Sequence, residues 1–194
     1  MSRNNPETKR LQAKVNRHKR EWLSRLLIGS GVVLLAAMLI VLFSRPKDSQ
    51  IVPVRMGQPL SDFTLSNLDG NPVRLSDYAG RPVIVNAWAE WCPPCRAEMP
   101  ALNDYYRQHS GDDLVVLAVN AGDSQAVAAK FVNSAGLEFP VVLDSTGEVL
   151  NAFGIYSFPT SIFVGRDGRV KAIHIGMFTP ETLEQEFTPL LIQE

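Results

Sequence analysis

Cysteine and histidine are scarce in this chain of 194 residues, which contains two cysteines and three histidines. A four-ligand zinc site needs a second Cys or His pair beside the first, and His18, His109 and His174 do not supply one. The sequence also lacks internal repeats and low-complexity segments. Hydrophobic residues make up 45% and charged residues 20%, which excludes wholesale disorder. This length suits one ordinary domain with an appendage.

One long run lacks charge altogether. Leu26–Phe43 spans 18 residues, and Ser30 carries its only polar side chain. As a helix the run would extend about 27 Å, close to the hydrocarbon thickness of a bilayer. A core helix would show a polar face, and a signal peptide would have a shorter apolar stretch with a small-residue cleavage site. Neither feature is present, so we predict an uncleaved transmembrane anchor over residues 26–44.

Charge is divided unevenly about this run. Residues 1–25 carry eight Lys or Arg and two Glu, a balance of +6, which leaves −7 on the rest of the chain. Basic flanks stay on the cytoplasmic side, so we expect a basic cytoplasmic arm over 1–25 and the C-terminal part outside the cell membrane. The arm then needs no nucleic acid as a partner. Residues 45–58 are predicted to be a linker and residues 59–194 the folded domain.

Apolar runs alternate with helix-like segments from Leu60 onward. Turn residues at Asp69–Asn71 and Arg166–Arg169 predict two hairpins. The predicted strands are Phe63–Ser66, Pro72–Leu75, Val83–Trp88, Leu114–Asn120, Phe139–Leu143, Ser161–Val164 and Val170–Ile175. The predicted helices are Pro94–Gln108, a helix capped by Ser124 that ends at Ala135 before Gly136, and a last helix capped by Thr179. This order predicts an α/β fold with a central mixed sheet and helices on both faces.

Both cysteines lie in Trp91-Cys92-Pro93-Pro94-Cys95, after a predicted buried strand and at the start of a predicted helix. Two intervening residues at a helix start let the sulfurs approach disulfide distance. Unpaired N–H groups and the helix dipole stabilise a thiolate at Cys92, and the thiolate is the species that attacks disulfides. A purely structural bridge over so short a loop would stabilise little. The motif therefore predicts redox exchange, in which Cys92 attacks and Cys95, one turn further and more buried, resolves the mixed disulfide.

The segment Asn86–Pro100, NAWAEWCPPCRAEMP, resembles the active-site segment of the thioredoxin superfamily. In particular it resembles the TlpA/ResA-type membrane-anchored thiol-disulfide oxidoreductases, which include partners of cytochrome c maturation. The resemblance covers about Met56–Ile192. It implies a thioredoxin-like fold with an N-terminal hairpin extension and an inserted segment near Asp123–Phe153.

The resemblance also implies roles for single residues. Phe158-Pro159-Thr160 matches the cis-proline loop, which lies against the disulfide and pairs with substrate backbone; an ordinary trans-proline at a strand start is the alternative. Asn86 stands where cytoplasmic thioredoxin has a buried Asp. Glu98 matches an acid that ResA-type proteins keep near the active site, and a solvated helix Glu is its alternative. Glu90 is expected at the surface. The expected substrate-binding residues are Trp91, Pro93, Phe158, Pro159, Thr160, Gly176 and Met177.

The leading prediction is an extracytoplasmic reductase of protein disulfides, without a cofactor or metal, that a membrane thiol-disulfide donor recharges. Apocytochrome c is the substrate that the resemblance implies. An oxidase or isomerase would use the same cysteines at a higher potential. A peroxiredoxin-like peroxidase would need a reactive Cys preceded by Pro and Thr, which this chain lacks. A copper chaperone of related fold would space its cysteines one residue wider and use a distal His, for which only His174 is a candidate.

Overall fold

The computed structural model describes Met38 and residues 51–192. The predicted arm over 1–25 and, apart from Met38, the predicted anchor over 26–44 lie outside the described residues. Within the described part of the chain, no helix combines the length and the apolar character needed to cross a membrane.

Seven strands form one sheet, in the order β2-β1-β5-β4-β3-β6-β7. Their bounds are β1 Thr64–Asn67, β2 Pro72–Arg74, β3 Val83–Trp88, β4 Val115–Ala121, β5 Val141–Asp144, β6 Thr160–Val164 and β7 Val170–Ile175. The central strands β3, β4 and β5 run parallel. The β1–β2 and β6–β7 hairpins pair antiparallel to their neighbours. The predicted mixed sheet and both predicted hairpins are confirmed.

Side-chain alternation along β3 and β4 divides the core into two halves. Ile84 and Trp88 of β3 pack on one face, and Val83, Val85 and Ala87 pack on the other. All six residues of β3 are buried, as expected for a central strand covered on both sides. This is why the apolar run is nearly continuous in sequence.

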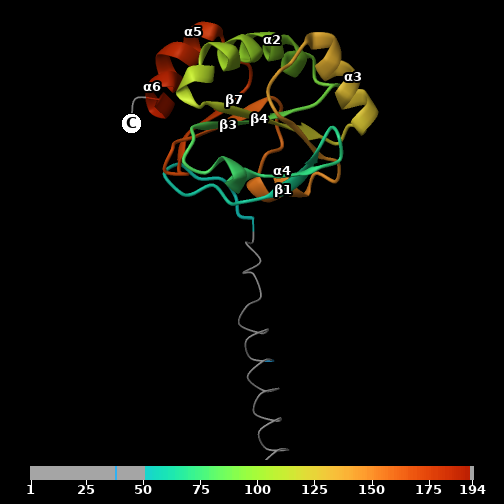
Figure 1. Ribbon diagram of the computed structural model, residues 1–194, viewed down its shortest axis with the longest axis horizontal. Coiled ribbons are helices and arrows are strands. Elements are labelled where there is room, and N and C mark those ends of the chain that lie inside the picture. Colours follow the sequence, from blue (N-terminus) through green and yellow to red (C-terminus); the bar gives the residue numbers. More distant parts are fainter. Residues whose placement is uncertain (1–37, 39–50, 193–194) are drawn as a thin grey trace, which may run out of the picture. The chain divides into compact units, whose positions relative to one another are not determined.

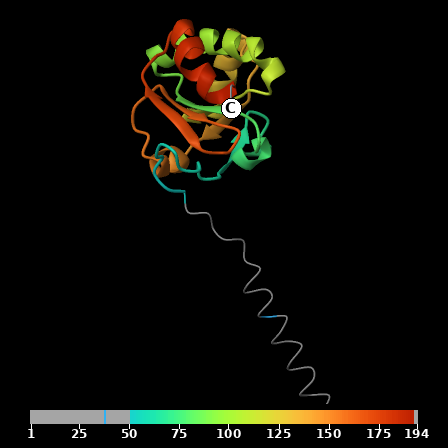
Figure 2. The ribbon, with the colours of Figure 1, turned by 90° about the vertical axis from the view of Figure 1, so that its left-hand side faces the viewer.

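Helices cover both faces of the sheet unequally. The helical segments are α2 Pro93–Gln108, α3 Gln125–Ala135, α4 Glu148–Phe153, α5 Pro180–Thr182, a π-helical stretch Leu183–Phe187 and α6 Thr188–Ile192. Figures 1 and 2 show α2, α3, α5 and α6 on one face, while α4 lies on the other. The face covered by more helices is the one that carries the cysteines, because both cysteines belong to the core half beneath α2.

Helix ends follow the predicted capping residues. The Ser124 side chain accepts a hydrogen bond from the Val127 N–H at the start of α3. Gly136 ends that helix with φ 61°, a left-handed conformation that favours glycine. The Thr179 side chain caps α5 in the same way as Ser124 caps α3.

Two features were not predicted. The first is α4, a six-residue helix without a side-chain cap, so no capping residue in the sequence marks where it begins. The buried Asp144 carboxylate, which lies before the helix in sequence, accepts the Leu150 N–H in place of such a cap. In addition, residues 51–58, assigned to the linker from sequence, are hydrogen-bonded to the domain. Val54 N–H donates to Phe153, and Gly57 N–H donates to Val170.

Candidate active site

The cysteine segment connects the end of β3 to the start of α2. β3 ends at Trp88 and α2 begins at Pro93, so Cys92 is the capping residue of the helix. The Cys95 N–H donates a hydrogen bond to Cys92 Sγ over 3.2 Å. A proline at the first helical position costs no hydrogen bond, since the N–H there has no partner within the helix. The free N–H groups and the helix dipole both favour a thiolate at Cys92.

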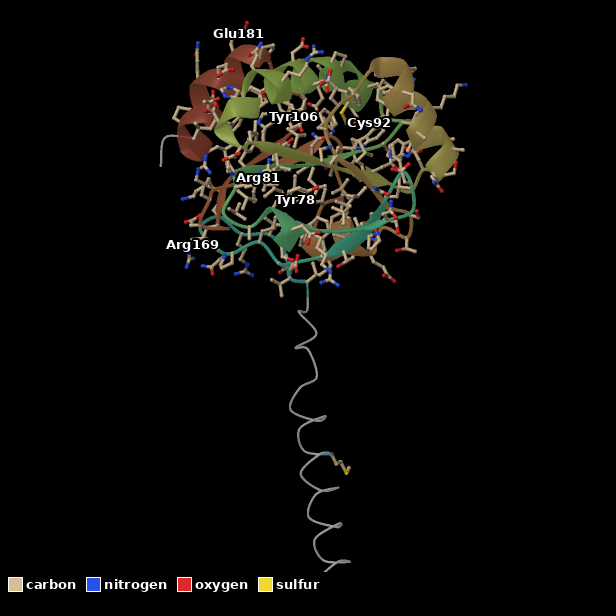
Figure 3. The ribbon with its side chains drawn as sticks, in the orientation of Figure 1. Tyr78, Arg81, Cys92, Tyr106, Arg169 and Glu181 are labelled. Carbon is tan, nitrogen blue, oxygen red and sulfur yellow. A yellow bond between two sulfur atoms is a disulfide. The ribbon has the colours of Figure 1, made fainter. Side chains whose placement is uncertain are left out.

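Cys92 and Cys95 are joined in a disulfide, with their Cα atoms 5.3 Å apart. Cys92 is 4% exposed and Cys95 is 0% exposed, so the predicted order of burial is confirmed. Figure 3 shows Cys92 on the side of the sheet covered by α2 and α3. Because only Cys92 has any solvent contact, an incoming partner reaches this sulfur first.

The predicted cis-proline loop is confirmed: the Phe158–Pro159 peptide bond is cis. The Phe158 ring meets the Trp91 ring edge-on, with centroids 5.7 Å apart. Gly176 N–H donates to the Pro159 carbonyl over 2.8 Å, and Thr160 Oγ1 donates to the Ser157 carbonyl over 2.7 Å. The loop from α4 to β6, the cysteine segment and the end of β7 are therefore tied together.

Exposed apolar side chains surround this junction. Trp91 is 61% exposed, Met177 51% and Ile175 69%, and Pro93 is also exposed on the first turn of α2. A protein partner can cover such side chains when it presents its own cysteine to Cys92.

Glu98 is buried in the core and is 2% exposed, so the alternative of a solvated helix residue is wrong. It lies three residues beyond Cys95 on α2, which places both side chains on the same side of the helix. Glu98 Oε1 accepts a hydrogen bond from Asn86 Nδ2 over 2.9 Å. Oε2 has no partner at normal hydrogen-bonding distance among the described residues.

Burial raises the pKa of Glu98 from its ordinary value of 4.5 to about 7. The hydrogen bond from Asn86 and the backbone of Phe178 act in the opposite direction, because they stabilise the carboxylate. Near pH 7 the group is therefore divided between its neutral and ionised forms. A group in that state accepts and returns a proton readily.

The polar contacts that Ser161 and Asp123 make near the site were not predicted from sequence. Ser161 Oγ accepts the second N–H of Asn86 over 2.9 Å. Asp123 Oδ2 accepts the Glu90 N–H over 2.7 Å and Asn120 Nδ2 over 2.8 Å, which holds the loop that leads to Cys92. Glu90 is half-buried and pairs with Arg96. Ser161 follows directly after the cis-proline loop, and that position was the only available signal.

His174 lies on β7, as predicted, and its ring contacts Phe178 and Phe187. Its Nε2 lies 3.2 Å from the Met177 carbonyl. Across the residues that the structure describes, no three His, Cys, Asp or Glu side chains are grouped to hold a metal ion.

The fold and the paired cysteines place this protein in the thioredoxin-like class of thiol-disulfide oxidoreductases. The chain belongs to the AhpC/TSA family, which it matches over residues 56–173. It is similar to the thiol-disulfide oxidoreductase ResA of Geobacillus thermodenitrificans, with 40% identity over 132 residues that cover 68% of this chain and 76% of that protein. The same-named protein of Oceanobacillus iheyensis is 33% identical over 179 residues, covering 89% and 92%.

A solved structure supports the same assignment. StoA from Bacillus subtilis superposes with a TM-score of 0.57 at 30% identity, covering 66% of this chain and 97% of that one. The chain is therefore a thiol-disulfide oxidoreductase with protein thiols and disulfides as its substrates.

Proposed function

We propose that this protein is a membrane-anchored reductase of protein disulfides on the outer side of the cell membrane. The uncharged run Leu26–Phe43 behind a basic arm supports the anchor and the orientation. The similarity to proteins named ResA supports the chemistry. The burial of the Glu98 carboxyl one helical turn beyond Cys95 is the single observation on which the choice of a reductase over an oxidase rests.

The electrostatic argument for reduction starts from Glu98. An ionised carboxylate beside the cysteines repels a thiolate and so raises the pKa of each thiol. Thiolates that are poorly stabilised make the reduced protein less favourable and hence more reducing; DsbA is a strong oxidant because its reduced form is stabilised. A buried acid one turn beyond Cys95 therefore favours a low reduction potential, and with it a reductase.

The reaction proceeds in two exchanges. The Cys92 thiolate attacks one sulfur of a substrate disulfide, which forms the mixed disulfide and releases the other substrate sulfur as a thiolate that takes up a proton. Cys95 then transfers its proton to Glu98 and attacks Cys92 Sγ. The substrate leaves with both sulfurs reduced, and the Cys92–Cys95 bond forms. A membrane protein with a dithiol would return the pair to the reduced state by the reverse exchange.

As substrate we propose apocytochrome c, whose Cys-x-x-Cys-His segment must be reduced before haem attaches. This proposal rests on the resemblance to the TlpA/ResA-type proteins. The exposed side chains of Trp91, Ile175 and Met177 suit an extended, unfolded segment, since they offer apolar contact without a defined shape.

The decisive measurement is the reduction potential of the Cys92–Cys95 pair in the full chain, taken by equilibration with a dithiol of known potential. A value near ~−270 mV, the potential of thioredoxin, supports a reductase, and a value near ~−120 mV, that of DsbA, rejects it. The rate with an oxidised Cys-x-x-Cys-His peptide, compared with a cyclic disulfide peptide of unrelated sequence, tests the substrate. Equal rates would reject the apocytochrome proposal.

A further inference from the structure

Three polar side chains meet in the core behind the cysteines. Asn86 is 0% exposed, Ser161 1% and Glu98 2%. They come from β3, β6 and α2, and Asn86 and Ser161 stand opposite each other in the β3–β6 ladder. Asn86 Nδ2 lies 2.9 Å from Glu98 Oε1 and 2.9 Å from Ser161 Oγ. The three side chains form one hydrogen-bonded chain.

The number of N–H donors on Asn86 shows which oxygen of the Glu98 carboxyl can carry the proton. An amide nitrogen has two N–H groups, and Asn86 uses one on Glu98 and one on Ser161. Oε1 of Glu98 is therefore occupied as an acceptor, and Oε2 is the oxygen left to carry the proton. Asn86 Oδ1 and Glu98 Oε2 both lack a partner at normal hydrogen-bonding distance among the described residues. Such unpaired buried atoms are costly, and apolar side chains of similar size would avoid that cost.

We propose that Asn86 and Ser161 are positioning residues for the thiol-disulfide exchange: they fix the Glu98 carboxyl so that Oε2 exchanges the proton of Cys95. This inference rests on the proposed role of Glu98 as the proton acceptor. Ser161 acts through Asn86, because its hydroxyl holds the Asn86 amide in the orientation that donates to Glu98 Oε1.

The arrangement also sets the pH at which Glu98 works. The amide donates to the carboxylate form and so opposes the effect of burial. None of the causes of the shift is a neighbouring charge: the groups that act on the carboxyl are the Asn86 amide from β3, which also contacts Ser161 from β6, and the Phe178 backbone. Removal of the amide donor leaves only the Phe178 backbone to oppose burial, so Glu98 would hold its proton to higher pH and accept that of Cys95 less often.

The test uses Asn86→Leu, which keeps the branched shape of the side chain without its polar atoms, and Ser161→Ala, with Ser161→Thr as the matched control that retains a hydroxyl. The rate at which Cys95 resolves a preformed mixed disulfide is measured in the full chain across pH 5–9. In Asn86→Leu the midpoint of the pH profile should move up by about one unit, and the rate at pH 7 should fall about fivefold. Ser161→Ala should move it in the same direction, and Ser161→Thr should restore the parent profile.

NMR titration of the Glu98 carboxyl carbon in the oxidised protein gives a second readout, because the disulfide does not titrate there. Its midpoint should rise in Asn86→Leu and in Ser161→Ala. If Asn86→Leu does not fold, Ser161→Ala carries the test alone. Unshifted profiles and titrations in these variants, together with an altered profile in Glu98→Gln, would overturn this inference and leave the proposed function standing. A Glu98→Gln profile that overlays the parent would instead reject the role of Glu98 itself.

Discussion

The backbone N–H of Cys95 donates to the sulfur of Cys92 over 3.2 Å, within the first turn of α2. This contact makes Cys92 the side-chain cap of the helix. In the reduced protein the same N–H is available to a Cys92 thiolate, which accepts hydrogen bonds better than a neutral sulfur does. The N–H that belongs to the resolving cysteine thus favours ionisation of the attacking cysteine.

Substitution of each cysteine in turn should show which one attacks the substrate and which one resolves the mixed disulfide. Cys95→Ser should accumulate mixed disulfides through Cys92, because attack still occurs and resolution does not. Cys92→Ser should trap few partners, since Cys95 is fully buried. Non-reducing gels of membranes from cells that express each variant measure the trapped species. Equal trapping by both variants would contradict the assignment.

Replacement of Glu98 by glutamine should change the kinetics in two ways. Loss of the proton acceptor should slow resolution of the mixed disulfide about 10²-fold at neutral pH, at the low end of the usual effect of general base catalysis. Loss of the negative charge should lower the pKa of each thiol, so thiol reactivity should extend to lower pH. Rapid mixing with a small-molecule disulfide across pH 5–9 measures both effects. Superimposable profiles for parent and variant would show that another group accepts the proton.

Glu98 should also make the oxidised protein less stable as the pH rises. In the unfolded chain the carboxyl loses its proton near pH 4.5, whereas in the folded protein it keeps the proton until about pH 7. Below pH 4.5 both states are protonated, so stability is unaffected; between these values the folded state binds more protons, and stability falls with rising pH. The total loss for this group is about 3 kcal/mol. Urea denaturation from pH 4 to pH 8 should show this slope, and Glu98→Gln should lack it.

Trp91 should matter for protein substrates and little for stability. Its side chain is 61% exposed and contacts the Phe158 ring edge-on. Trp91→Ala should lower kcat/KM for a protein disulfide about tenfold, the effect of losing one exposed aromatic contact of about 1.4 kcal/mol. The rate with a small-molecule disulfide should change less than twofold. Leu190→Ala, at an exposed position on α6, is the control, and an equal loss in that variant would show that the effect is not local.

The proposed topology can be tested on intact cells. A thiol reagent that does not cross membranes should label Cys92 after mild reduction, because residues 45–194 are proposed to lie outside. An engineered cysteine at Ser2, in the basic arm, should be labelled only after lysis, in a Cys92→Ser, Cys95→Ser background. Labelling of Cys92 only after lysis would reject the orientation.

Local patterns in the sequence predicted most of the fold. Val83–Trp88 was predicted with both its bounds, because a strand buried on two faces is apolar at nearly every position, here at all but Asn86. The Cys-Pro-Pro-Cys motif, the Ser124 cap and Gly136 each act within one helical turn, so their chemistry is visible in neighbouring residues. The short helix α4 was missed because it begins at a glycine without a side-chain cap.

Only the tertiary structure determined the contacts and the burial that set the pKa of Glu98. Asn86 and Ser161 lie 75 residues apart in sequence, and only the antiparallel pairing of β3 with β6 brings them together. The sequence placed Glu98 on the same side of α2 as the cysteines but left its solvation open. Burial, which depends on the sheet below and on the 176–179 loop beside it, raises its pKa to about 7. Helical spacing is a property of one segment, whereas desolvation of a carboxyl depends on every segment packed around it.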